Sequence, residues 1–313
     1  MKILHLNNPA QVATNLVKAQ KILGLDATLV VTSTKGWHKN FDYDLSNINT
    51  KSITGKIDIG KKLYDLIREC DILHYHGQAV SNGYRDLLMW SGIMDKPVVL
   101  HHHGSEIRDK DYPKLINDFV RHRYVSTPDL LEFVPDAEWL PNPVDIANLE
   151  YSKSEISSTL RVLHAPTDRK VKNTIAVESA ISTLKDEGLD IQLTLAENIQ
   201  HSELIELIKQ NDLVIDWVNP DFGIYGVFSI EAMALGRTVI CSLNDSHYDD
   251  YDLPIINVSP DLLCSKIREL SKNRSVLVEI GKTSHDFVQS HHNPIECAKK
   301  VIKKYEEILS YHD

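Results

Sequence analysis

Short apolar runs alternate along the chain with longer segments in which apolar residues recur at helical spacing. In the first half, a helix is predicted over about 10–23, with Gly24 as its end. Strands are predicted at 3–6, 27–31, 71–76 and 97–102. This alternation is typical of βαβ units, so it predicts an α/β fold with a mainly parallel sheet.

The same pattern begins again in the second half. Strands are predicted at 160–164, 191–195, 212–216 and 238–241, and a helix over about 173–187. Between the halves, Pro141 and Pro143 favour an extended connection over a helix. The 313 residues are enough for two cores. We therefore predict one domain at 1–145, a second at 146–293 and a final helix within 294–313 that packs back on the first domain.

Two of the predicted strands run into polar turns, His76-Gly77 and His103-Gly104. Open α/β sheets bind ligands beyond the carboxyl ends of their strands, so these turns lie where function is expected. His74 and His76 share one strand face, as do His101 and His103, and four imidazoles could build a metal site. No carboxylate or cysteine at ligand spacing accompanies them, and we expect no bound metal.

Composition excludes several classes of protein. The apolar fraction is 42% and the charged fraction 25%, and no apolar run is long enough to span a membrane. The chain starts in a strand-like stretch without the features of a signal peptide, so a cytoplasmic location is expected. The four cysteines are far apart and predict neither a zinc ribbon nor a disulfide framework.

The net charge of −10 argues against general nucleic-acid binding, which needs clustered Lys and Arg. The charge is uneven, because residues 1–100 carry 12 Lys and Arg against 9 Asp and Glu. A weakly basic first third could face an anionic acceptor or a membrane surface in peripheral contact. Ordinary scatter of surface charge is the alternative. The oligomeric state stays open.

The strongest local signal is the segment 223–240, which predicts a glycine-rich turn, a helix, a glycine stop and a buried strand. Gly223 and Gly226 allow the backbone to approach a ligand closely, and the helix start offers free N–H groups to an anion such as a diphosphate. The alternative is a turn with no ligand. Glu231 stands among apolar residues, so it needs a partner: sugar or ribose hydroxyls, or a salt bridge.

The pattern Gly-x-x-Gly-x-x-x-x-Glu-Ala-Met-Ala-x-Gly-x-x-Val-Ile resembles the donor-site signature of the retaining GT-B glycosyltransferases of family 4. The resemblance implies a GT-B architecture, in which two Rossmann-like doubly wound domains face a central cleft. It implies that Glu231 binds the ribose of a nucleotide. The family has another glutamate eight positions earlier that contacts the donor sugar, but Gly223 stands there. Asp221 or backbone groups are the candidates to replace it.

Other segments agree with the family in the expected order. The segment 161–174 resembles the first strand and loop of the donor domain, where Arg169 and Lys172 match the cations that clasp the diphosphate, with Lys170 as a nearby alternative. His103 and Gly104 resemble the turn that touches the transferred sugar. The stretch 141–145 resembles the interdomain connection, with Pro143 in place of glycine. The family's glycine-rich first loop is missing, its place taken by 7–10.

The resemblance implies an enzyme that moves a sugar from a nucleotide-diphosphate sugar to an acceptor hydroxyl with retention of anomeric configuration. The implied catalytic residues are His103, Arg169 and Lys172. The substrate-binding candidates are Gly104, Lys170, Asp221, Gly223, Tyr225, Gly226, Ser229 and Glu231. No cofactor or obligatory metal is implied.

The acceptor stays open among a glycan, a lipid-linked glycan, a small metabolite and a modified nucleic-acid base. Two alternative functions also stay open. One is a nucleotide-sugar epimerase on the same fold, because fold alone does not fix the reaction. The other is an inactive partner subunit of a transferase, for which the missing glutamate and glycine loop are the motivating features.

Overall fold

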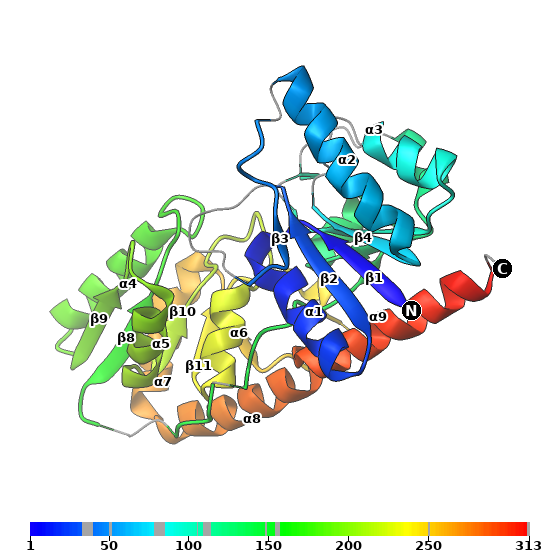
Figure 1. Ribbon diagram of the computed structural model, residues 1–313. Coiled ribbons are helices and arrows are strands. Elements are labelled where there is room, and N and C mark those ends of the chain that lie inside the picture. The colour runs from blue at the N-terminus through cyan, green and yellow to red at the C-terminus, as the bar shows by residue number, and fades with distance from the viewer. Residues whose placement is uncertain are drawn as a thin grey trace. The chain divides into compact units, whose positions relative to one another are not determined.

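The computed structural model describes residues 1–32, 40–49, 52–77, 85–104, 106–108, 114–147, 149–153, 157–249 and 251–311. Within these residues the chain forms two compact units. The first comprises Met1–Pro143 with Pro294–Asp313, and the second comprises Val144–Asn293. Each unit is built on its own parallel sheet (Figure 1).

The first unit has a seven-stranded sheet in the order β3-β2-β1-β4-β5-β6-β7, and all neighbouring strands are parallel. The strands are β1 (Lys2–Leu6), β2 (Asp26–Val31), β3 (Tyr43–Asp44), β4 (Ile72–His76), β5 (Val98–His102), β6 (His122–Val125) and β7 (Glu138–Trp139). The helices are α1 (Val12–Ile22), α2 (Ile53–Glu69), α3 (Arg85–Leu87), which continues into a π-helical stretch at Leu88–Ile93, and α9 (Pro294–Ser310).

Alternate residues of the strands face two different cores. Ile3, Ile72 and Val99 pack with the apolar faces of α1 and α9. Their neighbours Leu4 and Leu73 pack on the other side of the sheet with α2. The side chain of Ser52 caps α2 by accepting a hydrogen bond from the Gly55 N–H at 3.0 Å. Because both faces are covered, the strands read as continuous apolar runs.

The second unit has a five-stranded parallel sheet in the order β12-β11-β10-β8-β9. The strands are β8 (Leu160–His164), β9 (Ile191–Leu195), β10 (Leu213–Ile215), β11 (Thr238–Cys241) and β12 (Ile255–Asn257). The helices are α4 (Thr174–Asp186), α5 (His201–Gln210), α6 (Val227–Ala234), α7 (Leu263–Lys272) and α8 (Ser275–His291).

The prediction of an α/β fold with two parallel, Rossmann-like sheets is confirmed. Among the described residues, no helix has the length and apolar character needed to cross a membrane.

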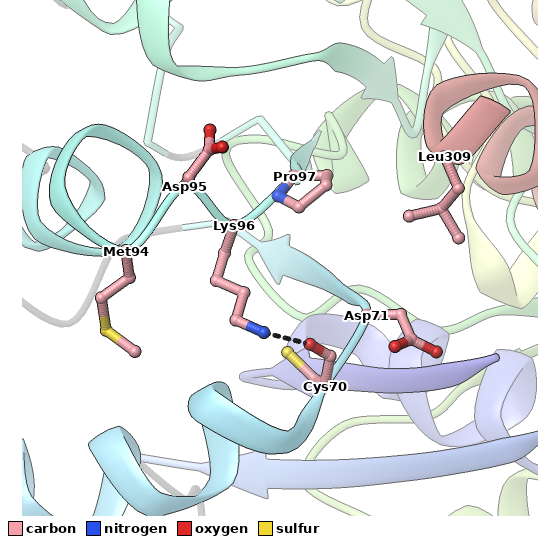
Figure 2. Close-up of a pocket in the computed structure, with 7 residues that line it drawn as sticks. All are labelled: Cys70, Asp71, Met94, Asp95, Lys96, Pro97 and Leu309. Atoms are coloured by element: carbon pink, nitrogen blue, oxygen red, sulfur yellow. Dashed lines mark hydrogen bonds between the residues drawn. The ribbon is translucent and has the colours of Figure 1, made fainter. Parts of the chain in front are cut away.

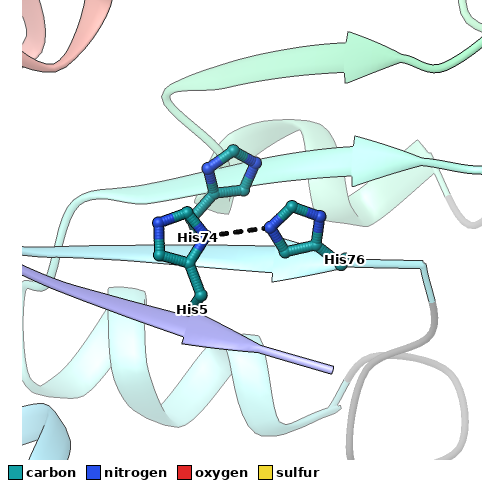
Figure 3. Close-up of side chains that lie close together, drawn as sticks. All are labelled: His5, His74 and His76. Atoms are coloured by element: carbon teal, nitrogen blue, oxygen red, sulfur yellow. Dashed lines mark hydrogen bonds between the residues drawn. The ribbon is translucent and has the colours of Figure 1, made fainter. Parts of the chain in front are cut away.

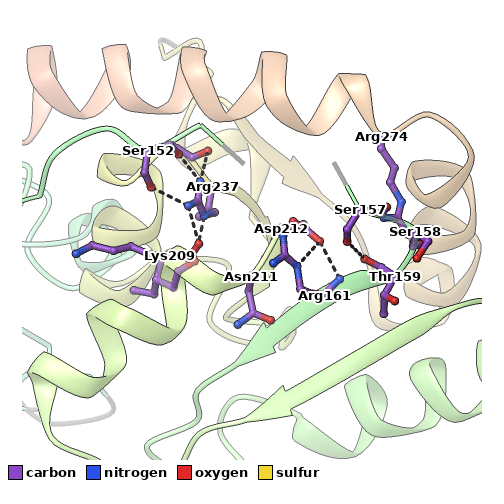
Figure 4. Close-up of polar contacts among 12 residues, drawn as sticks. Ser152, Ser157, Ser158, Thr159, Arg161, Lys209, Asn211, Asp212, Arg237 and Arg274 are labelled. Carbon is purple, nitrogen blue, oxygen red and sulfur yellow. Dashed lines mark hydrogen bonds and ion pairs between the residues drawn. The ribbon is translucent and has the colours of Figure 1, made fainter. Parts of the chain in front are cut away.

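Arg237 links two other backbone segments of the second unit (Figure 4). Its side chain is buried, with 2% of the residue exposed. The guanidinium donates to the carbonyl oxygens of Ile208 at 3.0 Å, Lys209 at 2.9 Å and Ser152 at 2.5 Å. These carbonyls lie at the end of α5 and in the connection before β8. One buried guanidinium therefore supplies hydrogen bonds to backbone carbonyls that lie outside the regular hydrogen bonding of helices and strands.

Replacing Arg237 with methionine is expected to lower the free energy of unfolding of the protein by at least about 3 kcal/mol, because several buried carbonyls lose their donor. Urea denaturation followed by circular dichroism measures the change. Arg268→Met is the control, since Arg268 forms an exposed pair with Glu187 and should change stability little. Equal effects of the two substitutions would contradict a structural role for Arg237.

Candidate functional site

The predicted glycine turn precedes α6 in the second unit and follows β10. Gly223 has a φ of +60°, a conformation that a side chain makes costly, and a Cβ built there would lie 2.7 Å from Cβ of Asn244. The Asn244 N–H donates to the Gly223 carbonyl at 3.0 Å. A glutamate would not fit at this position without movement of the backbone. The departure from the family pattern is therefore built into the local fold.

Gly226 is the residue before the first turn of α6. A Cβ at this position would lie 2.8 Å from Nε1 of Trp217. The close approach of Trp217 is thus by itself a reason for glycine at this position. Tyr225, beside it, is buried and its hydroxyl lies 3.0 Å from Nε2 of His292. Asp221 is exposed, and its backbone N–H donates to Oδ1 of Asn219 at 3.1 Å.

Glu231 lies on α6 with 7% of the residue exposed. Its Oε1 accepts a hydrogen bond from Nε2 of His201 at 2.7 Å. His201 is the first residue of α5, and 62% of its side chain is exposed. Hydrogen bonding to the carboxylate raises the pKa of His201 above its ordinary value. The buried carboxylate of Glu231 is thus hydrogen-bonded to a solvent-exposed side chain, which another hydrogen-bond donor can replace.

Lys172 is buried at the end of the loop that follows β8. Its ammonium forms an ion pair with Oδ1 of Asp216, directly after β10, and Oδ2 of Asp216 accepts from the Ser229 hydroxyl at 2.6 Å. The ammonium also lies 5.4 Å from the ring centre of Trp217 and 5.3 Å from that of Phe228. Lys172 therefore joins the strand ends to the first turn of α6.

Arg169 and Lys170 stand in the same loop but are exposed. Arg169 donates to Glu197 at 2.8 Å and to Glu178 at 3.3 Å, and the hydrogen bonds that Glu197 accepts raise the pKa of Arg169. The Lys170 N–H donates to Oδ1 of Asp168 at 2.8 Å, which holds the loop in a turn. The structure thus brings Lys172, Ser229 and Gly226 together, whereas Arg169 faces two solvent-exposed carboxylates.

In the first unit, the His103-Gly104 turn follows β5. Gly104 has a φ of +114°, and a Cβ there would lie 2.2 Å from Nη1 of Arg108. Arg108 donates to Asp129 at 2.8 Å and so anchors the turn to the neighbouring chain segment. The carboxylate of Glu106 accepts from the His103 N–H. Ser105, between them, lies outside the described residues.

Both ring nitrogens of His103 are engaged. Nε2 lies 3.3 Å from Nδ1 of His76, and Nδ1 lies 2.6 Å from the Ser126 hydroxyl. Figure 3 shows the neighbouring histidines His5 and His76, whose ring nitrogens are 2.9 Å apart, together with His74. Burial lowers the pKa of His103 to about 4. His103, the candidate contact to the sugar, is thus a neutral ring that is linked by hydrogen bonds to other imidazoles.

The first loop takes left-handed backbone conformations without glycine. The φ values are 68° at Asn7, 51° at Ala10 and 59° at Gln11, where glycine would carry less strain. Two hydrogen bonds between Asn8 and Thr14 hold the loop, with Oδ1 accepting from the Thr14 N–H at 3.1 Å. The loop therefore turns sharply at the end of β1 although the family's glycines are missing.

A surface hollow of about 390 Å³ lies at the opposite end of the same sheet (Figure 2). Its lining includes Cys70, Asp71, Lys96 and Pro97, which precede β4 and β5. The Lys96 ammonium donates to the Cys70 carbonyl at 2.6 Å. This hydrogen bond joins the segment before β5 to the segment before β4. Because ligands of open α/β sheets bind at the carboxyl ends of strands, this hollow is not our candidate site.

No family model matches the sequence, and no curated protein matches it either. Solved structures do match. Sucrose-phosphate synthase from Thermosynechococcus elongatus has a TM-score of 0.67 at 11% identity, with 99% of this chain and 100% of that chain covered. The chain has the GT-B fold.

An alpha-glucosyltransferase in complex with UDP and a 13-mer DNA containing a central A:G mismatch has a TM-score of 0.64 at 16% identity, covering 98% of this chain and 100% of that one. The UDP-N-acetylglucosamine 2-epimerase from Rickettsia bellii has a TM-score of 0.51 at 12% identity, with 99% and 97% covered. At these identities the likeness concerns the fold, which transferases and epimerases share.

Several residues of the site were not found from the sequence. Asp216 and His201 became visible only as partners of Lys172 and Glu231. Asp216 ends a predicted strand, and a buried carboxylate after an apolar run is a signal that could have found it. His201 gives no such signal, because its contact depends on how α5 packs against α6.

Proposed function

We propose that this chain is a retaining, family 4-like glycosyltransferase that moves a sugar from a nucleotide-diphosphate sugar to an acceptor hydroxyl. In this proposal the second unit binds the donor and the first unit supplies the acceptor side. Glu231 holds the ribose, Arg169 and Lys172 stabilise the phosphates, and the Gly226 turn approaches the donor. His103 orients the transferred sugar. Gly104, Lys170, Asp221, Gly223, Tyr225 and Ser229 complete the candidate set.

The observation that carries the proposal is the state of Glu231. A carboxylate with 7% exposure is costly unless it is hydrogen-bonded, and here its bond is to an exposed histidine. Glu231 lies on α6, the helix that begins directly after the glycine turn, in a chain with the GT-B fold. Ribose hydroxyls can replace His201 as donors without leaving the carboxylate unpaired.

The reaction needs no protein nucleophile. The acceptor oxygen forms the new bond to the anomeric carbon on the face from which the diphosphate leaves, and the bond to the phosphate oxygen breaks. The proton of the acceptor hydroxyl passes to the leaving phosphate. Charge therefore grows on the diphosphate, and cations aimed there lower the barrier. Arg169 must exchange Glu197 for phosphate to act in this way.

A panel of nucleotide sugars tests the proposal, with UDP sugars first because the DNA-bound alpha-glucosyltransferase is in complex with UDP. Binding is measured by calorimetry and transfer by mass spectrometry with a screen of glycans, lipid-linked glycans, metabolites and modified bases. Absence of binding at millimolar nucleotide would reject the proposal. An inverted product would reject retention alone.

Epimerisation is the second candidate, because a solved 2-epimerase shares this fold over nearly the whole chain. It predicts conversion of the donor sugar without any acceptor. Incubation of the pure protein with each UDP sugar alone, followed by chromatography of the sugars, separates the two reactions. A change of sugar identity in that assay favours epimerisation, and dependence on an acceptor favours transfer.

Glu231→Gln should weaken binding of a nucleoside diphosphate but leave binding of inorganic diphosphate almost unchanged, because only the former has ribose hydroxyls for the carboxylate to accept from. Isothermal titration calorimetry with the two ligands measures the difference. His201→Gln is the matched control, since it removes the displaceable partner and not the ribose acceptor. Equal losses for both ligands would assign Glu231 a structural role.

A further inference from the structure

Six side chains of the first unit form one unbroken series of hydrogen bonds. The links are Gln20 Oε1 to His5 Nε2 at 2.9 Å, His5 Nδ1 to His76 Nε2 at 2.9 Å, His76 Nδ1 to His103 Nε2 at 3.3 Å, His103 Nδ1 to Ser126 Oγ at 2.6 Å and Ser126 Oγ to His101 Nε2 at 3.2 Å. We call this series the histidine chain. Its second link is the dashed line in Figure 3.

The sheet register brings these residues together. Three parallel strands contribute: β1 carries His5, β4 carries His76 and β5 leads to His103. Gln20 comes from α1, which covers this face of the sheet. The exposed fractions of His5, His76 and His101 are 0%, 1% and 0%, so water does not compete for their nitrogens.

The rings of the histidine chain are neutral at physiological pH. Burial lowers the pKa of His5 and of His103 to about 4, and burial with neighbouring imidazoles lowers the pKa of His76 and His101 well below the ordinary value. A neutral imidazole has one N–H donor and one lone pair. Each ring of the chain can therefore give one hydrogen bond and accept one.

This restriction fixes the position of each ring proton, starting from the Gln20 end of the histidine chain. The Gln20 oxygen can only accept, so His5 donates from Nε2 and accepts at Nδ1. His76 then donates from Nε2 and accepts at Nδ1, and His103 follows in the same way. The hydroxyl of Ser126 donates to His103 Nδ1 and accepts from His101 Nε2. Nδ1 of His101 is left as a lone pair, and no partner for it occurs within the described ranges.

We infer that the histidine chain holds His103 in a single neutral tautomer, with the proton on Nε2 and the accepting lone pair on Nδ1. Gln20, His5 and His76 are then positioning residues that act through His103. Given the proposed function, His103 accepts a hydrogen bond from a hydroxyl of the transferred sugar, which takes the place of the Ser126 hydroxyl, and it does not donate one.

The same geometry disfavours a metal ion between His76, His101 and His103. Nitrogens of His76, His101 and His103 lie within 4.8 Å of one another. A metal needs three lone pairs that converge on one point. The rings of His101 and His103 are stacked, with centroids 4.4 Å apart and an angle of 29° between their planes. In the inferred tautomer the lone pairs of His76 and His103 already accept hydrogen bonds.

Long-range ¹H–¹⁵N correlation spectra of the ¹⁵N-histidine-labelled full chain at pH 7, without nucleotide, test the inference. His5, His76, His101 and His103 should all show the neutral form protonated at Nε2. His164 is an internal control with the opposite tautomer, since its Nδ1 faces the Ile215 carbonyl at 2.8 Å and must donate. A charged ring in the chain, or one protonated at Nδ1, would overturn the inference.

Gln20→Met tests transmission along the chain. It keeps the length of the side chain but removes the terminal acceptor, so the ¹⁵N shifts of His5, His76 and His103 should all move while His164 stays unchanged. Lys18→Met, an exposed change on the same helix, is the control and should move none of them. A change confined to His5 would show that Gln20 is a local contact only.

Two further arms separate the remaining outcomes. Added ZnCl₂ should leave the spectra unchanged, and selective loss of the His76, His101 and His103 signals would overturn the inference in favour of a metal site. Because the spectra need no substrate, they test the tautomer of His103 independently of nucleotide binding. Failure to bind nucleotide sugars rejects the proposed function while the tautomer pattern is decided by the spectra alone.

Discussion

Replacing Arg169 with alanine is expected to reduce turnover by about 10²–10³-fold, and to weaken binding of the nucleoside diphosphate much less. Charge grows on the leaving diphosphate as its bond to the sugar breaks, so a cation aimed there contributes more to rate than to ground-state affinity. Steady-state kinetics with the donor identified in the panel, together with calorimetry on the free diphosphate, measures the two effects separately.

The surroundings of Arg169 provide the controls. Glu197 and Glu178 hold its guanidinium in the unbound chain. Glu197→Gln removes one competitor for the guanidinium and should not reproduce the loss of turnover. Lys170→Ala tests the neighbouring cation of the same loop. Full activity of Arg169→Ala together with a large loss in Lys170→Ala would show that the phosphate cation is Lys170 and that Arg169 is a surface ion pair.

The strands and helices that we predicted from the sequence lie within a few residues of those in the structure. The strands predicted at 160–164, 191–195 and 238–241 have the bounds of β8, β9 and β11. Buried parallel strands are short continuous apolar runs, and this signal is local in the chain. The repetition of that pattern predicted two α/β domains, and the resemblance of the motif around Glu231 to a known family implied the GT-B architecture.

The partners of the candidate residues could not be predicted in the same way. The sequence showed His76 and His103 as possible metal ligands. In the structure His76 is linked through His5 to Gln20 on α1, and His103 is linked to Ser126, which follows β6. Such contacts depend on sheet register and helix packing, which single-chain periodicity does not reveal. The close packing of Gly223 against Asn244 also depends on a residue that is distant in the sequence.

The position of the cations shows the same limit. A basic loop after a strand suggested two phosphate ligands, and sequence reasoning had no means of separating the exposed Arg169 from the buried Lys172. The structure distinguishes them by their counter-ions, which are surface glutamates for Arg169 and the fully buried Asp216 for Lys172. The two residues therefore call for different experiments, although the motif treats them alike.

Lys172→Met should lower the free energy of unfolding by about 3–5 kcal/mol, because it leaves the carboxylate of Asp216 buried without its counter-ion. Urea denaturation measures this loss. The double variant Lys172→Met with Asp216→Asn should recover most of the stability, since the buried charge is gone and the asparagine oxygen can still accept from Ser229. Failure of the double variant to recover stability would contradict the assignment of the pair as the source of the loss.

Turnover of the stable double variant then decides what Lys172 does for the reaction. If the ammonium stabilises the leaving diphosphate, the double variant should fold well and still lose about 10²–10³-fold in turnover, because no other group restores that charge. If Lys172 only supports the first turn of α6 through Asp216 and Ser229, turnover should return with stability. Since the intact fold of the double variant removes unfolding as an explanation, the kinetic result assigns the charge of Lys172 either to the diphosphate or to the core.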